Sequence, residues 1–341
     1  MNNQTTLAVK YRPQTFIDLV EQNSTKQILQ NQLETGNIRN AYLFCGPAGD
    51  GKTTTARIFA NEINKGVGNP IELDAASNNS VDDIRRINQQ AQTKSLEGEY
   101  KIFILDECHS LSNSAWQAML KLIEEPPAKT IFIFCTTDPQ KIPKTILSRV
   151  QRYNFQRITY QGILDRLKYV CKQENLNNVD EEALQLIAKL ANGGMRDALT
   201  HLDKCIAYED RITTETVSSA LGIVGYDTLF DLTNNFIYTD GITKIIDIVE
   251  ELYNKGIDLK SFIKSWLLFV LDIQKYILTH NFEYLQIPNT YRNKLEEYQK
   301  DYMDTTTIFD LLNILIKLNY AIKWETDPKA MIESALIVGV V

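Results

Sequence analysis

An eight-residue segment of the chain has the residue types and spacing of a phosphate-binding loop. Residues 46–53 read Gly-Pro-Ala-Gly-Asp-Gly-Lys-Thr, which fits the pattern G-x-x-x-x-G-K-[ST]. The glycines let backbone N–H groups converge on phosphate oxygens, Lys52 reaches the β and γ phosphates, and the Thr53 hydroxyl binds Mg²⁺. The loop stands between an apolar run, 41–45, and a helical pattern, 53–64. This context predicts a nucleotide-binding site.

Two acidic residues end an apolar strand further along the chain. Residues 101–107 read Lys-Ile-Phe-Ile-Leu-Asp-Glu, so Asp106 and Glu107 are expected at the carboxyl edge of a sheet, where ligands bind in open α/β folds. Asp106 would hold Mg²⁺ through water, and Glu107 would polarise the attacking water as general base. A second apolar strand, 131–135, is followed by threonines at 136 and 137, where a hydroxyl could contact the γ-phosphate or the water.

Strands and helices alternate in the first half of the chain. We expect strands at 41–45, 70–74, 101–106, 130–136 and 152–155, and helices at 53–64, 81–92 and 114–125. Strands separated by helices indicate a parallel sheet covered on both faces, which predicts an α/β domain.

Helices are expected after residue 155. Apolar residues such as Leu184, Ile187 and Leu190 recur at three- and four-residue spacing, which is typical of amphipathic helices. Glycines at 193–194 interrupt this region, and those at 222–225 suggest a hinge. We therefore expect a nucleotide-binding domain at 1–155, a helical domain at 156–224 and a second helical domain at 225–341.

The composition is that of an ordinary globular protein. Hydrophobic residues make up 44% and charged residues 23% of the 341 residues. The net charge of −7 argues against a generally basic nucleic-acid-binding surface, but most of the acidic excess lies in 221–341. Any DNA contact is therefore expected from one face of the first domain. The N-terminal residues 1–14 show no signal-peptide pattern and no apolar run is long enough to span a membrane, so a cytoplasmic protein is expected.

The five cysteines stand singly along the chain. No C-x-x-C pair and no zinc-type spacing with histidine is present in the sequence. Reduced thiols that pack as small apolar residues are the expected state, and no zinc is predicted.

The order of the motifs resembles that of the AAA+ clamp-loader ATPases, in particular those of the bacterial DNA polymerase III gamma/tau type. Besides the phosphate loop, the resemblance rests on Lys10-Tyr11-Arg12-Pro13, Glu72 to Ser77, Val81 to Arg85, Asp106 to His109, Thr136 to Pro143 and Gly194 to Leu199. The match is dense over residues 1 to about 210 and thin beyond, where only residues 327–336 are similar to the last collar helix of the family.

The resemblance implies a parallel five-stranded α/β ATPase domain, a small helical lid and an all-α collar through which five subunits assemble. It implies ATP and Mg²⁺ as ligands, and a sliding clamp, primer-template DNA and other clamp-loader subunits or copies of the chain as partners. Thr137 resembles sensor 1, Arg149 the arginine finger that acts on the neighbouring subunit's ATP, and Arg196 the sensor 2 of the lid. The expected ATP-binding residues are Tyr11, Arg12, Pro13, Gly46, Pro47, Ala48, Gly49, Asp50, Gly51, Lys52, Thr53 and Thr54.

The chain departs from the family pattern in two places. The bacterial family has a four-cysteine zinc module before its second strand, whereas residues 61–70 form a short connector without cysteine. The arginine-finger motif is usually Ser-Arg-Cys but reads Ser148-Arg149-Val150 in this chain. Because the guanidinium does the chemistry, the role of Arg149 is expected to survive.

DNA contacts are expected at the start of the helix at 81–92. Ser77, Asn78, Asn79 and Ser80 precede this helix, and their N–H groups and short polar side chains could hold a phosphate. The alternative is an N-cap, for which Ser80 with Asp83 three residues later is suited. Lys144 and Thr145 are a second candidate.

The leading hypothesis is an ATP-hydrolysing motor subunit of a sliding-clamp loader. One alternative is another AAA+ replication ATPase, either a branch-migration helicase or an initiator, but residues 225–341 contain no basic recognition helix. The other is a non-hydrolysing scaffold subunit, which could have lost the loop, the acid pair or either arginine.

Overall fold

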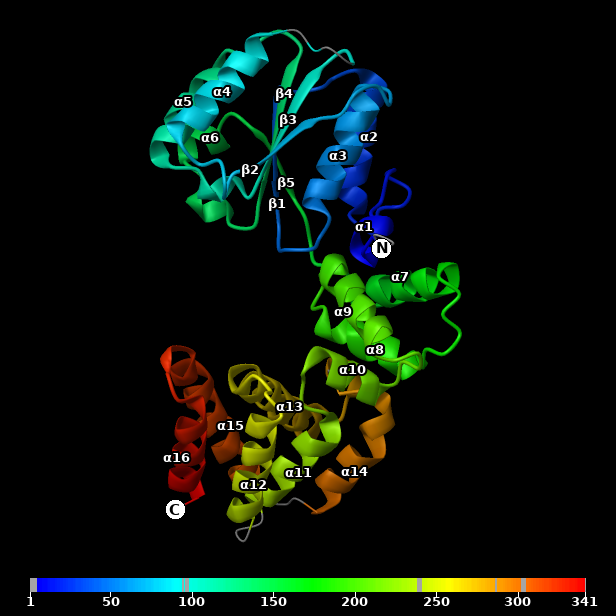
Figure 1. The fold of residues 1–341 in the computed structure, drawn as a ribbon, viewed down its shortest axis with the longest axis vertical. Helices are drawn as coiled ribbons and strands as arrows, with labels where there is room; N and C mark the ends of the chain where they lie inside the picture. The colour runs from blue at the N-terminus through cyan, green and yellow to red at the C-terminus, as the bar shows by residue number, and fades with distance from the viewer. Residues whose placement is uncertain are drawn as a thin grey trace. The chain divides into compact units, whose positions relative to one another are not determined.

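A five-stranded parallel sheet is the scaffold of the N-terminal half (Figure 1). The computed structural model describes residues 5–93, 95, 98–237, 241–285, 287–301 and 305–340. The strands are β1 (Ala41–Cys45), β2 (Ile71–Asp74), β3 (Lys101–Asp106), β4 (Thr130–Thr136) and β5 (Gln151–Asn154). Their order is β2-β3-β4-β1-β5, and every pairing is parallel. This confirms the predicted α/β class, and it brings the carboxyl ends of β1, β3 and β4 together at one edge.

Both faces of the sheet are covered because its central strands are apolar on both sides. On β1, Leu43 belongs to the core beneath α4 (Val81–Gln92) and α5 (Asn113–Glu124), while Tyr42 and Phe44 belong to the core on the opposite face. Figure 1 shows α4, α5 and α6 on one side of the sheet and α2 and α3 on the other. The remaining helices of this half are α1 (Leu7–Lys10), α2 (Asn23–Thr35), α3 (Lys52–Ile63) and α6 (Lys144–Leu147), with short 3-10 turns at Cys108–Ser110 and Pro139–Lys141.

Four helices follow the sheet. They are α7 (Tyr160–Gln173), α8 (Glu181–Leu190), α9 (Met195–Tyr208) and α10 (Thr214–Leu221). The chain divides into two units, Met1–Val170 with Leu190–Thr200 and Cys171–Lys189 with His201–Val341. Residues 156–224 thus contribute to both units, and the boundaries near 155 and 224 stay predictions.

The C-terminal helices enclose one apolar core. They are α11 (Tyr226–Ile237), α12 (Ile242–Asn254), α13 (Leu259–Thr279), α14 (Arg292–Asp301), α15 (Thr305–Ala321) and α16 (Pro328–Val340), with 3-10 turns at Phe282–Tyr284, Asn289–Tyr291 and Ile322–Trp324. Trp266 is fully buried there, and its indole N–H donates to the Thr233 hydroxyl at 2.9 Å. This bond meets the rule that a buried polar group needs a partner. Within the described residues, no helix is long and apolar enough to cross a membrane.

Candidate nucleotide-binding site

The predicted phosphate loop joins β1 to α3. Strand β1 ends at Cys45, and α3 begins at Lys52 with no side-chain cap at its N-terminus. Gly49 and Gly51 have φ values of +75° and +96°, a region that favours glycine. The loop therefore brings the backbone to the start of a helix, where free N–H groups and the helix dipole favour an anion.

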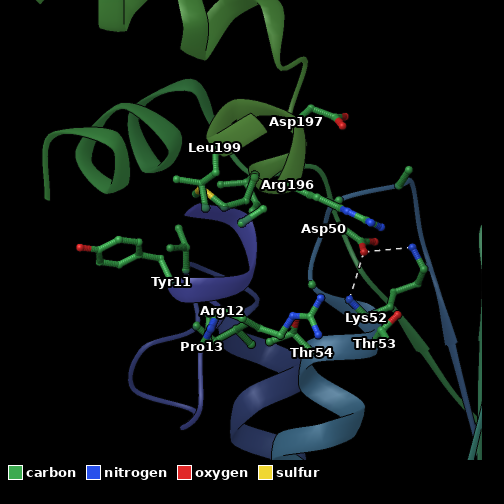
Figure 2. Close-up of a pocket in the computed structure, with 18 of the residues that line it drawn as sticks. Tyr11, Arg12, Pro13, Asp50, Lys52, Thr53, Thr54, Arg196, Asp197 and Leu199 are labelled. Atoms are coloured by element: carbon green, nitrogen blue, oxygen red, sulfur yellow. Dashed lines mark hydrogen bonds and ion pairs between the residues drawn. The ribbon is translucent and has the colours of Figure 1, made fainter. Parts of the chain in front are cut away.

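The Lys52 side chain folds back into this loop and is 5% exposed. Its Nζ donates to the backbone oxygens of Gly46 at 2.7 Å and Pro47 at 2.5 Å, and to Asp50 Oδ1 at 3.0 Å. Figure 2 shows Asp50 directed toward Lys52, with the bonds to the amine and to the Lys52 backbone N–H drawn as dashed lines. Burial raises the pKa of the Asp50 carboxyl, and the Lys52 amine offsets this only in part.

The end of β3 supplies two carboxylates with different surroundings. Asp106 Oδ2 accepts a 2.8 Å hydrogen bond from the Thr53 hydroxyl, which places the two predicted Mg²⁺-side groups together. Glu107 has a left-handed φ of +46°, and its Oε2 accepts from the Thr137 hydroxyl at 3.1 Å. His109 Nδ1 lies 3.2 Å from the same oxygen. The sequence motif at 106–109 contains His109 but predicts no role for it, because the contact depends on the turn after β3.

The loop and the acids face a cavity of about 520 Å³. This volume lies within the roughly 300–1,000 Å³ of small-molecule sites. The lining includes the N-terminal segment at 8–20, the phosphate loop with Thr54, Ile158, Arg166 and the start of α9, all within one unit. Figure 2 shows Arg12 and Pro13 below the cavity, Tyr11 at its edge, and the Arg196 side chain extending toward the side where Lys52 lies. All predicted ATP-binding residues except Gly46 and Pro47 line this cavity, and Lys52 contacts both of these residues.

Two arginines that no sequence motif predicts also line the cavity. Arg166 Nη2 donates to the Tyr11 backbone oxygen at 3.0 Å, and its guanidinium lies 4.9 Å from the ring centroid of Tyr169. Arg57 lies one turn along α3 and pairs with Glu72 at 2.5 Å. Single arginines outside a motif carry no signal in one sequence, so only the fold could reveal them.

Gly194 lies against the phosphate loop. A Cβ on Gly49 would lie 2.9 Å from Gly194 Cα, closer than real contacts allow. The Met195 N–H donates to the Gly49 oxygen at 2.9 Å. The start of α9, which carries Arg196, is therefore hydrogen-bonded to the loop itself.

Arg149 is not among the residues that line the cavity. It is exposed, and its guanidinium pairs with Glu124 at 2.7 Å and donates to the Thr145 backbone oxygen at 2.8 Å. Lys144 and Thr145 are exposed on α6, also outside the cavity lining.

The predicted DNA-contacting segment before α4 contains a complete capping box. The Ser80 hydroxyl accepts from the Asp83 N–H at 3.3 Å, and Asp83 Oδ2 accepts from the Ser80 N–H at 3.1 Å. The N-cap alternative is thus formed. Ser77, Asn78 and Asn79 are the preceding residues, and none of them lines the cavity.

The side chains at the sheet edge offer ligands suited to Mg²⁺, whereas the cysteines that a zinc site would use are buried thiols. The Thr53 hydroxyl and the Asp106 carboxylate are hard oxygen donors, adjacent at the sheet edge, and they fit Mg²⁺. The five cysteines are all buried as free thiols, and the described part of the chain holds no group of three or more His, Cys, Asp or Glu residues that could bind a metal.

Comparison with protein families gives two matches within this chain. Residues 69–159 match the family described as DNA polymerase III, delta subunit. Residues 162–211 match the family described as DNA polymerase III clamp loader subunit, ATPase lid domain.

Curated relatives match most of the chain. DNA polymerase III subunit tau of Bacillus subtilis is 35% identical over 96% of this chain and 62% of its own length. The subunit tau of Escherichia coli is 35% identical over 74% of this chain and 42% of its own length. The chain therefore spans less than two thirds of these relatives.

Comparison with solved structures identifies a protein of similar fold. The Thermotoga maritima RuvB Holliday junction branch migration motor superposes with a TM-score of 0.52 at 20% identity, covering 73% of this chain and 86% of that one. This likeness indicates the AAA+ fold alone. The lid match and the tau relatives show that the chain resembles the clamp-loader ATPases, and in particular the gamma/tau subunits of bacterial DNA polymerase III.

Proposed function

We propose that this chain is an ATP-hydrolysing motor subunit of a DNA sliding-clamp loader, which opens the clamp and places it on primer-template DNA. The observation that carries the proposal is the convergence of Lys52, Thr53, Asp106 and Glu107 on one cavity at the carboxyl edge of the sheet. A cation, a Mg²⁺-binding pair and a candidate base are the groups that phosphoryl transfer to water requires.

Each of these residues would have a separate role in ATP hydrolysis. Lys52 and the loop N–H groups would bind the β and γ phosphates, while Thr53 and Asp106 would hold Mg²⁺, which neutralises phosphate charge when it is bound. Glu107 would accept a proton from the attacking water, and Thr137 holds the carboxylate through its 3.1 Å bond.

The adenine side of the site would be the N-terminal segment. Tyr11, Arg12 and Pro13 line the cavity there, and Arg166 binds the backbone of this segment. Arg196 would contact the γ-phosphate as sensor 2, because the start of α9 is bonded to the loop. Thr54 follows the Mg²⁺-side Thr53 on α3 and would contact the α-phosphate region.

We also propose assembly into a five-membered ring with other clamp-loader subunits or copies of this chain. An apolar stripe on α15 and the turn after it supports a subunit interface: Phe309, Ile316, Tyr320 and Trp324 are all exposed, Trp324 to 85%. Exposed aromatic side chains at helical spacing are typical of protein interfaces. In such a ring Arg149 would act on a neighbour's ATP, and residues 225–341 would form the collar beyond a lid at 156–224.

The clamp and primer-template DNA are the proposed partners outside the ring. Ser77, Asn78, Asn79 and Ser80, with Lys144 and Thr145 on α6, remain the proposed DNA contacts. The Ser80 cap does not exclude this role, because the exposed Asn79 side chain leaves room for a phosphate contact.

The direct test is ATP binding by Lys52→Ala. We expect affinity to fall by more than about tenfold, because a charge-assisted hydrogen bond to phosphate is lost. Isothermal titration with MgATP measures this. Since the substitution leaves the Asp50 carboxylate buried without its cation, Lys52→Met combined with Asp50→Asn serves as a charge-balanced control for folding. Unchanged affinity in both folded variants would refute the phosphate-loop assignment.

The function class is tested by steady-state hydrolysis. ATP turnover by the assembled ring should rise when clamp and primer-template DNA are both added. A rate of ATP hydrolysis that does not change when clamp and DNA are added would favour another AAA+ replication ATPase. The absence of hydrolysis in every assembly would favour a scaffold subunit.

A further inference from the structure

The phosphate loop contains a buried carboxylate of its own. Asp50 is 1% exposed, and its Oδ1 accepts two bonds from Lys52, one from Nζ at 3.0 Å and one from the backbone N–H at 3.1 Å. Its Oδ2 has no hydrogen-bond partner among the described residues and is shielded from solvent. A Cβ on Gly46 would lie 2.1 Å from Oδ2, so the carboxylate is tightly confined against the loop.

Phosphate and Asp50 need the same amine. The Lys52 Nζ is held by two neutral carbonyl oxygens and by one carboxylate. Phosphates that use Lys52 must take the amine from these acceptors, and Asp50 is the charged acceptor of the three. Once the amine has moved, the carboxylate stays buried close to several phosphate charges, a costly arrangement unless it is neutralised.

We propose that Asp50 sets the affinity of the ATP site by competing with bound phosphates for Lys52, and that ATP binding draws a proton from solvent onto the Asp50 carboxylate. The inference rests on the proposed ATP site and adds to it a residue that weakens binding. The proton comes from solvent and forms an O–H bond on Asp50, the hydrogen bond from Lys52 to Asp50 is lost, and no other covalent bond changes. Before ATP binds, the Asp50 carboxylate is an internal anion, and ATP must displace it from Lys52. This competition would keep nucleotide exchange fast.

Among the described residues, Lys52 is the cation that makes a hydrogen bond to the Asp50 carboxylate. The other titratable groups coupled to this carboxylate are the thiols of Cys45 on β1 and Cys135 on β4. Burial raises the pKa of both thiols, so they remain neutral near pH 7. Burial also raises the pKa of Asp50, in the direction that favours proton uptake when Lys52 leaves.

The first experiment compares MgATP affinities by isothermal titration at pH 7.5. Asp50→Asn keeps the size of the side chain and its Oδ1 acceptor, and Asp50→Thr removes the carboxylate with a smaller group. We expect each to tighten ATP binding about tenfold, because the competing charged hydrogen bond is gone. Glu99→Gln is the matched control: it removes a carboxylate from an exposed pair with Lys129 and should leave affinity unchanged.

The second experiment counts protons. Titrations in two buffers of different ionisation enthalpy should show uptake of up to about one proton per ATP for the wild type and less for Asp50→Asn. The wild-type affinity should rise as pH falls from 8 to 6, and the profile of the variant should be flatter. This readout separates a charged competitor from a residue that merely shapes the loop.

The outcomes distinguish a failure of the proposed role of Asp50 from a failure of the proposed ATP site. Affinity that is unchanged or weaker in folded Asp50→Asn and Asp50→Thr, or equal proton uptake in wild type and variant, overturns the role of Asp50 alone. A wild-type chain that binds no ATP overturns the proposed function itself.

Discussion

Glu107 illustrates how a single residue is prepared for its proposed role. Its left-handed φ turns the chain sharply at the end of β3, a conformation that non-glycine residues adopt rarely and at a cost of roughly 1–3 kcal/mol. The Thr137 hydroxyl and the His109 ring both lie against Oε2. A side chain held on two sides at the mouth of the cavity is suited to orient a water molecule.

Replacing Glu107 with Gln tests this arrangement. The amide keeps the shape and can still contact Thr137, but it cannot accept a proton. We expect ATP affinity to stay within about twofold while turnover falls about a hundredfold or more. Titration and a single-turnover phosphate-release assay measure the two quantities, with Glu99→Gln as the control. Hydrolysis at the wild-type rate would mean that the base lies elsewhere.

At the scale of an element, α4 shows how a local sequence fixes a helix start. The Ser80–Asp83 box satisfies two backbone N–H groups at the N-terminus, and Ile84, Ile87 and Ala91 bury the apolar face of the helix. Hydrogen bonds from Ser80 lower the pKa of Asp83. A depressed carboxyl pKa stabilises the fold above the ordinary pKa of aspartate, and this stabilisation is lost as pH falls through the lowered value.

The corresponding prediction concerns Ser80→Ala. Loss of the cap should cost about 1 kcal/mol in the free energy of unfolding of the first unit, measured by urea denaturation at pH 7. Ser80→Thr retains a capping hydroxyl and should lower the free energy of unfolding by only a few tenths of a kcal/mol. The deficit of Ser80→Ala should shrink as pH falls from about 4 through the lowered pKa of Asp83. A deficit that does not change with pH would show that the Asp83 half of the box contributes nothing.

At the scale of the whole molecule, two exposed features bear on the proposed assembly. Arg149 lies outside the cavity lining and pairs with Glu124 on the surface of its unit. The apolar stripe on α15, with Tyr320 and Trp324 at its end, faces solvent. Both observations support a ring in which a neighbour covers the stripe and receives the arginine.

Mixing two inactive variants tests whether Arg149 acts across a subunit boundary. Arg149→Ala should spare ATP binding and lower hydrolysis about a thousandfold, the scale typical of an arginine finger. Rings that contain both Arg149→Ala and Lys52→Ala subunits should recover activity, because some interfaces pair an intact loop with an intact finger. Native mass spectrometry verifies mixed assembly, and phosphate release measures turnover. Mixed rings no more active than the separate variants would place Arg149 in cis or in a structural role.

The sequence by itself determined the elements that carry a local pattern. The strands expected at 41–45, 101–106 and 130–136 and the helix at 81–92 have these bounds in the structure, because apolar runs and capping residues are properties of neighbouring positions. The phosphate-loop glycines and the acids after β3 are likewise readable as motifs. Helix α2 was not predicted, because its mostly polar sequence shows little apolar periodicity.

Tertiary structure alone decided which distant residues meet. The bond from Arg166 to Tyr11, the approach of Gly194 to Gly49 and the contact of Thr137 with Glu107 join positions far apart in the chain. Even the pairing of Asp50 with Lys52, two residues apart, depends on a loop that buries both charges. Local periodicity reports the backbone conformation of a segment, whereas these contacts arise from the crossovers that bring strand ends and helix starts to one edge of the sheet.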